Sequence, residues 1–176
     1  DQEQGRKWRP MKTIEYKTLD RSSWPSGRWD DEPDKKQWQD EATGLPCLIV
    51  RNSAGAWCGY VGVSEGHPLF EVSDNDAIDS DGERLSCHGG LTFANFCRPG
   101  NEEHSICHRV EPGESDRVWW LGFDCSHYMD ASPRDIAEHG FGAGEYCCQS
   151  YVEDNVRELA HQLKAIAKAS GQGGEA

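Results

Sequence analysis

Three short segments place a histidine beside residues that could ligate a metal or support catalysis. They are Glu65-Gly66-His67-Pro68, Cys87-His88-Gly89-Gly90 and Asp124-Cys125-Ser126-His127. Two or three imidazoles with one carboxylate can bind zinc or a similar divalent ion and leave one position open for water. We therefore predict a divalent metal site, with zinc as the first choice, made by His67, His88, Asp124 and His127.

Other chemistries remain open for the same segments. As a metal-assisted hydrolase, the protein would use Glu65 as its base. Without a metal, Cys87 or Cys125 would be the nucleophile, a histidine its base and Asp124 the orienting group. A third interpretation is a ligand pocket without chemistry, and a fourth is a set of histidines that only fix turns. The ligand-binding residues that we expect are Gly89, Gly90, Trp119 and Trp120.

The elements that must position these residues are mostly strands. Residues 118–123 form an apolar run that ends at Asp124, and residues 45–52 and 56–63 flank a Ser-Ala-Gly turn as a hairpin. A strand near Leu91 and an edge strand within 12–19 complete the expected sheet. A C-terminal helix follows from apolar residues spaced by three and four: Val152, Val156, Leu159, Leu163 and Ile166. The pattern predicts an α+β fold, loop-rich, with a mostly antiparallel sheet packed by this helix.

The chain of 176 residues suits one domain, which we place at residues 12–170. Residues 1–11 are expected to be a leader outside the fold, disordered or of expression origin, and residues 171–176 a flexible tail. Two segments are expected to lack long regular structure. One carries Trp24, Trp29 and Trp38 and would attach to the body through buried aromatic rings; the other spans 124–144.

Composition limits the class of protein. The chain has 31 Asp and Glu against 18 Lys and Arg, a formal charge of −13, which argues against direct nucleic-acid binding. The acids cluster at 30–34, 74–83 and 111–116, as solvated loops or as a surface for a basic partner. No run suits a membrane span and no signal segment opens the chain, so we expect a soluble intracellular protein. The eight cysteines include no CxxC pair, and we expect mostly reduced thiols.

Five ordered motifs carry a resemblance to a family of proteins encoded by bacteriophages and prophages, a family with no established activity. The motifs span roughly residues 24–163 and include TGLPCLIVRN, CGYVGV with GHP, HGGLT and WWLGFDCSH. The resemblance implies a phage accessory protein in the host bacterial cytoplasm, with a small-molecule ligand or a host protein as partner, and by analogy a counter-defence role. The chain departs from the family pattern at Tyr128-Met129, which counts against Asp130 as a site residue.

Overall fold

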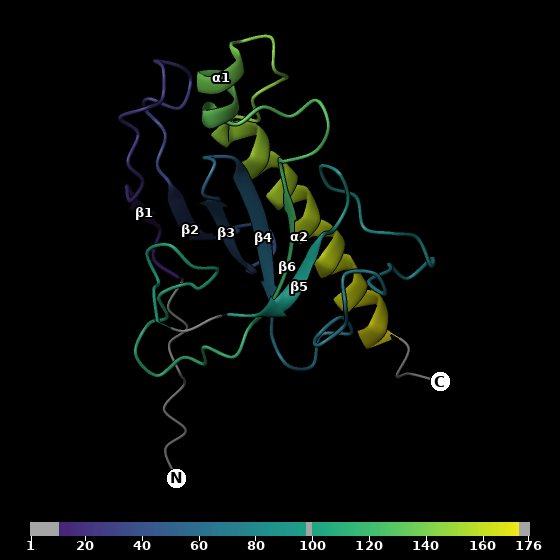
Figure 1. The fold of residues 1–176 in the computed structure, drawn as a ribbon. Helices are drawn as coiled ribbons and strands as arrows, with labels where there is room; N and C mark the ends of the chain where they lie inside the picture. The colour runs from purple at the N-terminus through teal and green to yellow at the C-terminus, as the bar shows by residue number, and fades with distance from the viewer. Residues whose placement is uncertain (1–10, 98–99, 173–176) are drawn as a thin grey trace.

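A six-stranded antiparallel sheet forms the centre of the molecule (Figure 1), in a computed structural model that describes residues 11–97 and 100–172. The strand order is β1-β2-β3-β4-β6-β5. The predicted α+β class is confirmed. The strands are β1 (Ile14–Tyr16), β2 (Lys35–Gln39), β3 (Pro46–Arg51), β4 (Trp57–Val63), β5 (Phe93–Phe96) and β6 (Trp119–Asp124), and the helices are α1 (Pro133–His139) and α2 (Gln149–Gln172).

The predicted hairpin is confirmed as β3 and β4, and β4 is buried along its whole length. Alternate side chains of a strand face opposite sides of the sheet. Trp57 and Val61 therefore enter the core beneath α2, while Tyr60 enters a second apolar cluster on the other face. Gly59 lets the helix approach closely, because a Cβ there would lie 2.7 Å from Val156 Cγ2.

The C-terminal helix α2 crosses one face of the sheet, as the periodic apolar residues predicted. Its five stripe residues, Val152, Val156, Leu159, Leu163 and Ile166, are all buried. The helix continues through Gly171 to Gln172, so the tail predicted from residue 171 begins too early. Residues 173–176 of that predicted tail lie outside the described part of the chain.

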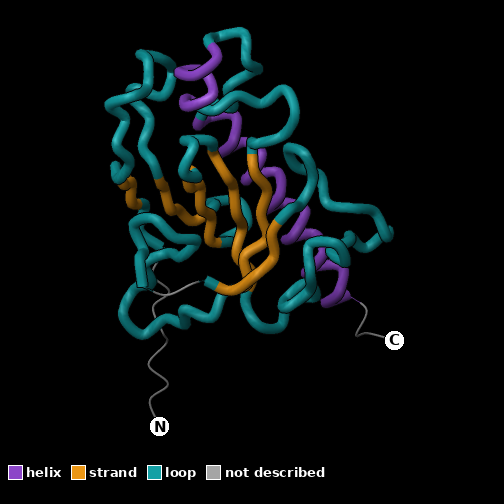
Figure 2. The backbone as a smooth tube through the Cα atoms, viewed as in Figure 1, coloured by secondary structure: helices purple, strands orange, loops and turns teal. Residues whose placement is uncertain are grey.

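The opposite face of the sheet is covered by the long connection between β5 and β6, which Figure 2 draws as loop. Ile106 packs there on the second cluster, and a disulfide joins Cys97 to Cys107. The other six cysteines are free, in line with the expectation of mostly reduced thiols. Buried Lys35 holds the loop further, since its Nζ donates to the backbone carbonyls of Glu102, Ser105 and Cys107.

Two elements were missed by the sequence analysis. Strand β2 lies in the tryptophan-bearing segment, where Trp38 is a buried strand residue. Helix α1 interrupts the predicted loop 124–144; Ser132 caps it, with Asp135 completing a capping box. The predicted aromatic attachment does occur, because Trp29 is buried against Ile136 of α1.

The acidic run 30–34 is only partly a solvated loop. Glu32 and Asp34 are buried, and both form ion pairs with the buried side chain of Arg51, at 2.8 Å and 3.4 Å. Of the predicted leader, residues 1–10 lie outside the described part, while the Met11 N–H donates to Gln39 Oε1 at 2.8 Å. Within the described residues, no helix has the length and apolarity that a membrane crossing requires.

Candidate metal centre

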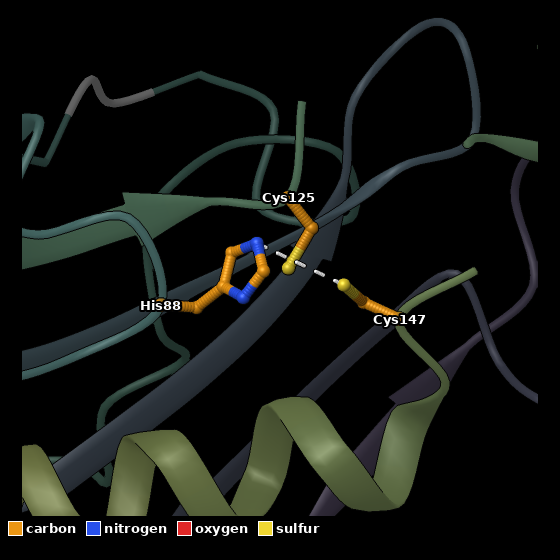
Figure 3. Close-up of side chains that lie close together, drawn as sticks. All are labelled: His88, Cys125 and Cys147. Atoms are coloured by element: carbon orange, nitrogen blue, oxygen red, sulfur yellow. Dashed lines mark hydrogen bonds between the residues drawn. The ribbon is translucent and has the colours of Figure 1, made fainter. Parts of the chain in front are cut away.

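Five potential ligand side chains gather between the end of β6 and the start of α2. The Nε2 atom of His88 lies 2.8 Å from Asp130 Oδ2 and 3.9 Å from Cys147 Sγ. One ligand atom each from His88, Cys125 and Cys147 fits within 4.8 Å, and so does one each from His88, His127 and Asp130. Figure 3 shows both sulfur atoms and the imidazole edge directed toward one another.

Strand alternation places Cys125 in this cluster and turns Asp124 away from it. Phe123 and Cys125 belong to the core under α2, so Asp124, between them, points to the other face. There its Oδ2 accepts from Thr92 Oγ1 at 2.9 Å, and its Oδ1 accepts from the Ser126 N–H at 3.0 Å. Asp124 keeps only a distant contact with the cluster, 3.9 Å from His127 Nδ1.

The loop that carries His88 is fixed on α2. Asn155 Oδ1 accepts from the backbone N–H of His88 at 3.0 Å, and the Tyr151 hydroxyl lies 2.8 Å from His88 Nδ1. These contacts direct Nε2 toward the two thiols. Gly89, with φ 68°, makes room for the neighbouring ring, because a Cβ there would lie 2.2 Å from His127 Cε1.

Asp130 is held by a tight turn and by the strand-like segment that precedes α2. Its Oδ2 accepts from the His127 N–H at 2.9 Å, and the Glu145 N–H donates to the Met129 carbonyl at 2.8 Å. Met129 has a φ of 77°, a conformation that non-glycine residues seldom adopt and that often marks a functional turn. The pairing of Asp130 with Glu145 sets this carboxylate beside the segment that carries Cys147, two residues further along the chain.

The charges at the centre follow from burial and hydrogen bonding. Burial raises the pKa of Asp130, but hydrogen bonds from His88 and His127 outweigh it, and the pKa lies below its ordinary value. A hydrogen bond with Cys147, followed by burial, raises the pKa of the Cys125 thiol far above its usual range. Burial raises the pKa of Cys87 to about 12. In the metal-free protein, neither Cys87 nor Cys125 is therefore an activated nucleophile.

The geometry suits a metal better than a thiol triad. A triad needs the carboxylate on one imidazole nitrogen and the thiol on the other, whereas Asp130 and Cys147 share Nε2 of His88. Tetrahedral zinc, with bonds of about 2.3 Å to sulfur and 2.0 Å to nitrogen, separates the two ligand atoms by about 3.5 Å. The observed 3.9 Å between Cys147 Sγ and His88 Nε2 requires only a small adjustment.

Two of the predicted site residues lie elsewhere. His67 Nε2 is 2.8 Å from the Leu163 carbonyl and its Nδ1 accepts from the Leu69 N–H, so both nitrogens have partners. Leu163 lies 12 residues beyond Tyr151 on α2, about 18 Å at 1.5 Å per residue. Glu65 is exposed in the turn beside His67. His67 as a ligand and Glu65 as a base are therefore not supported, because the tips of the two loops do not converge.

The predicted ligand-binding residues also separate. Trp119 is half-buried and donates its Nε1–H to the Val72 carbonyl, and Trp120 is fully buried on the sheet face opposite α2. A Cβ placed on Gly90 would meet no neighbouring atom within 4 Å, whereas a Cβ on Gly89 would meet the His127 ring. Two surface cavities, of about 470 Å³ and 410 Å³, are lined by none of the predicted site residues.

Cys147 and Tyr151 were not among the residues predicted from the sequence, and the departure from the family pattern counted against Asp130. A signal for part of this set was present, because Tyr151 and Asn155 are four residues apart in the helical pattern and therefore share one face of α2. These two side chains contact His88. No comparable signal marked Asp130, whose position depends on the pairing with Glu145.

Fold and site together define an antiparallel α+β protein with a mixed histidine, cysteine and carboxylate cluster at one end of its sheet. In comparisons with protein-family models, curated proteins and solved structures, no match to this chain was found.

Proposed function

We propose that the protein binds one divalent ion of the zinc class through His88, Cys125 and Cys147, and uses it to hydrolyse a small substrate. The observation that carries this proposal is the convergence of two sulfur atoms and a carboxylate on one imidazole nitrogen. Thiolate and imidazole ligands favour zinc over magnesium or calcium. Three protein ligands leave a fourth position for water, as in catalytic zinc sites.

The neighbouring polar groups suit the roles around such an ion. When Nε2 of His88 ligates the metal, Nδ1–H can donate to the Tyr151 hydroxyl, which fixes the ring and its tautomer. Asp130 is then released from its contact with Nε2 and remains held by the His127 N–H. With an ion bound at these ligands, Asp130 would be placed to serve as the general base for a water molecule at the open position. His127, with 35% of its side chain exposed, can pass the accepted proton to solvent.

Elemental analysis of protein purified without a metal-affinity column tests the centre. We expect about one zinc per chain in the native protein and less than about a tenth in His88→Ala and Cys147→Ser. Cys87→Ser is the matched control, because this free thiol lies in the same loop as His88 but outside the cluster. A folded native protein that takes up no zinc would refute the metal centre.

Hydrolysis is tested separately with the zinc-loaded protein and a p-nitrophenyl ester. Asp130→Asn should keep the ion but lower kcat by about 100-fold or more, the usual contribution of a general base. If Asp130→Asn hydrolyses the ester at the native rate, Asp130 is not the base. If the native zinc protein hydrolyses neither p-nitrophenyl acetate nor bis-p-nitrophenyl phosphate, the hydrolase assignment fails and the metal assignment stands.

The setting that we propose, from the motif resemblance, is the cytoplasm of a phage-infected bacterium, where the protein acts as an accessory factor.

One observation supports a second candidate function, a non-enzymatic counter-defence role. The acidic segments 74–83 and 111–116 are largely exposed on a chain of charge −13, and could dock on a basic host protein or accompany sequestration of a small host ligand. Salt-sensitive capture of a basic host protein that survives mutation of His67, His88 and His127 would favour this function.

A further inference from the structure

We infer that the metal centre is regulated by oxidation: Cys125 and Cys147 form a disulfide that expels the ion. This inference rests on the proposed function, because it concerns the same centre. Its basis is the placement of two sulfur ligands within 4.8 Å of each other, facing one another beside His88. A disulfide requires a sulfur separation of about 2.05 Å, so closure is a movement of about 3 Å or less.

The two thiols differ in access, and this sets the order of events. Cys147 is half-buried in the segment before α2, whereas Cys125 is 3% exposed. An oxidant such as hydrogen peroxide therefore reaches Cys147 first. Cys147 lies in the non-helical segment between Glu145 and α2, where the backbone can shift without breaking a helical hydrogen bond. Cys125 continues the β6 ladder, with its N–H bonded to the Trp57 carbonyl, and stays in place.

The chemistry balances with peroxide as the oxidant. The Cys147 thiolate attacks one peroxide oxygen, the O–O bond breaks, and Cys147 becomes a sulfenic acid while the departing hydroxide takes a proton from solvent. The Cys125 thiolate then attacks that sulfur, the S–S bond forms, and a second hydroxide leaves and is protonated. Two thiolates lose two electrons in total, and peroxide becomes two waters. The ion loses two of three protein ligands and dissociates.

The positions of other cysteines argue against other disulfide partners for Cys147. Cys97 and Cys107 are already paired on the other face of the sheet. Cys148 follows Cys147 directly but turns to the opposite side, where its Sγ lies 3.1 Å from Arg28 Nη2. Cys125 is the cysteine grouped with Cys147 at His88, with ligand atoms within 4.8 Å of one another.

The test uses the full chain loaded with zinc and treated with hydrogen peroxide. Released zinc is followed with a chromogenic chelator, and peptide mapping identifies the linked cysteines. We expect about one zinc released for each Cys125–Cys147 disulfide formed, and rebinding after reduction. The mapping is repeated on Cys148→Ser, so that a link found in this peptide can be assigned to Cys147 and not to the adjacent Cys148. It is also repeated on Cys87→Ser. Both variants should release zinc and form the Cys125–Cys147 disulfide as the native protein does.

The outcomes separate this inference from the proposed function. A chain that takes up no zinc overturns the metal centre and this regulation together. A chain that binds zinc and retains it after peroxide, or releases it without a Cys125–Cys147 link, overturns the regulation alone. The Cys97–Cys107 disulfide should map unchanged before and after peroxide, and provides an internal reference.

Discussion

Replacing Arg51 by Met should be among the most destabilising single substitutions in the protein. The Arg51 side chain is fully buried and pairs with Glu32 and Asp34. Its guanidinium also donates to the Gly55 carbonyl at 2.7 Å and the Tyr146 hydroxyl at 2.8 Å. Methionine fills much of the same volume but leaves buried Glu32 without its ion-pair partner, while Asp34 keeps its ion pair with Arg21. Removing one partner of a buried ion pair costs about 3 to 5 kcal/mol, and we expect about 4 kcal/mol for this substitution.

Urea unfolding followed by tryptophan fluorescence measures this loss. With a slope of about 2 kcal/mol per molar, the midpoint should fall by about 2 M. Arg157→Met is the matched control, because Arg157 also pairs with two carboxylates, Glu153 at 3.1 Å and Asp154 at 3.0 Å, but is 44% exposed. Exposed pairs contribute below about 1 kcal/mol. If both variants lose the same free energy of unfolding, the buried Arg51 network stabilises the protein no more than a surface ion pair does, and the reasoning is refuted.

Two further predictions concern a glycine at the centre and a histidine outside it. Gly89→Ala places a Cβ 2.2 Å from the His127 ring in addition to backbone strain at φ 68°, whereas Gly90→Ala, at φ 80°, meets no neighbouring atom. Backbone strain should cost each variant about 1 to 2 kcal/mol in urea unfolding, and Gly89→Ala should lose more because of the clash. Only Gly89→Ala should also slow ester hydrolysis by the zinc-loaded protein, because it displaces His127 from the proposed proton path; equal rates in the two variants would contradict the contact. Burial lowers the pKa of His67, so the unfolded chain takes up a proton first as the pH falls below about 6.5, and stability decreases. His67→Gln should flatten the dependence of the unfolding free energy on pH in that range, and exposed His161→Gln should not; an unchanged slope in His67→Gln would oppose this explanation.

Local sequence patterns were sufficient for the main elements of the fold. The β3–β4 hairpin follows from two apolar runs around a Ser-Ala-Gly turn, and α2 from apolar residues at helical spacing. These signals are local because backbone geometry alone sets the periods of strands and helices. The short elements β2 and α1 were missed. In β2, Lys35 and Gln37 are buried through polar contacts with distant loops, which no hydrophobic period reveals.

The sequence by itself determined which residue types could ligate a metal, and it singled out the segments of His88 and His127, which the structure brings together. Tertiary structure alone decided which of them meet. Strand alternation turned Cys125 inward and Asp124 outward, and the pairing of Asp130 with Glu145 set a carboxylate beside Cys147. His67 has the same local context as His88 but packs on Leu163, far along α2. The ligands of a metal site come from segments that are far apart in the sequence. Which side chains become ligands therefore depends on long-range packing, which local spacing does not encode.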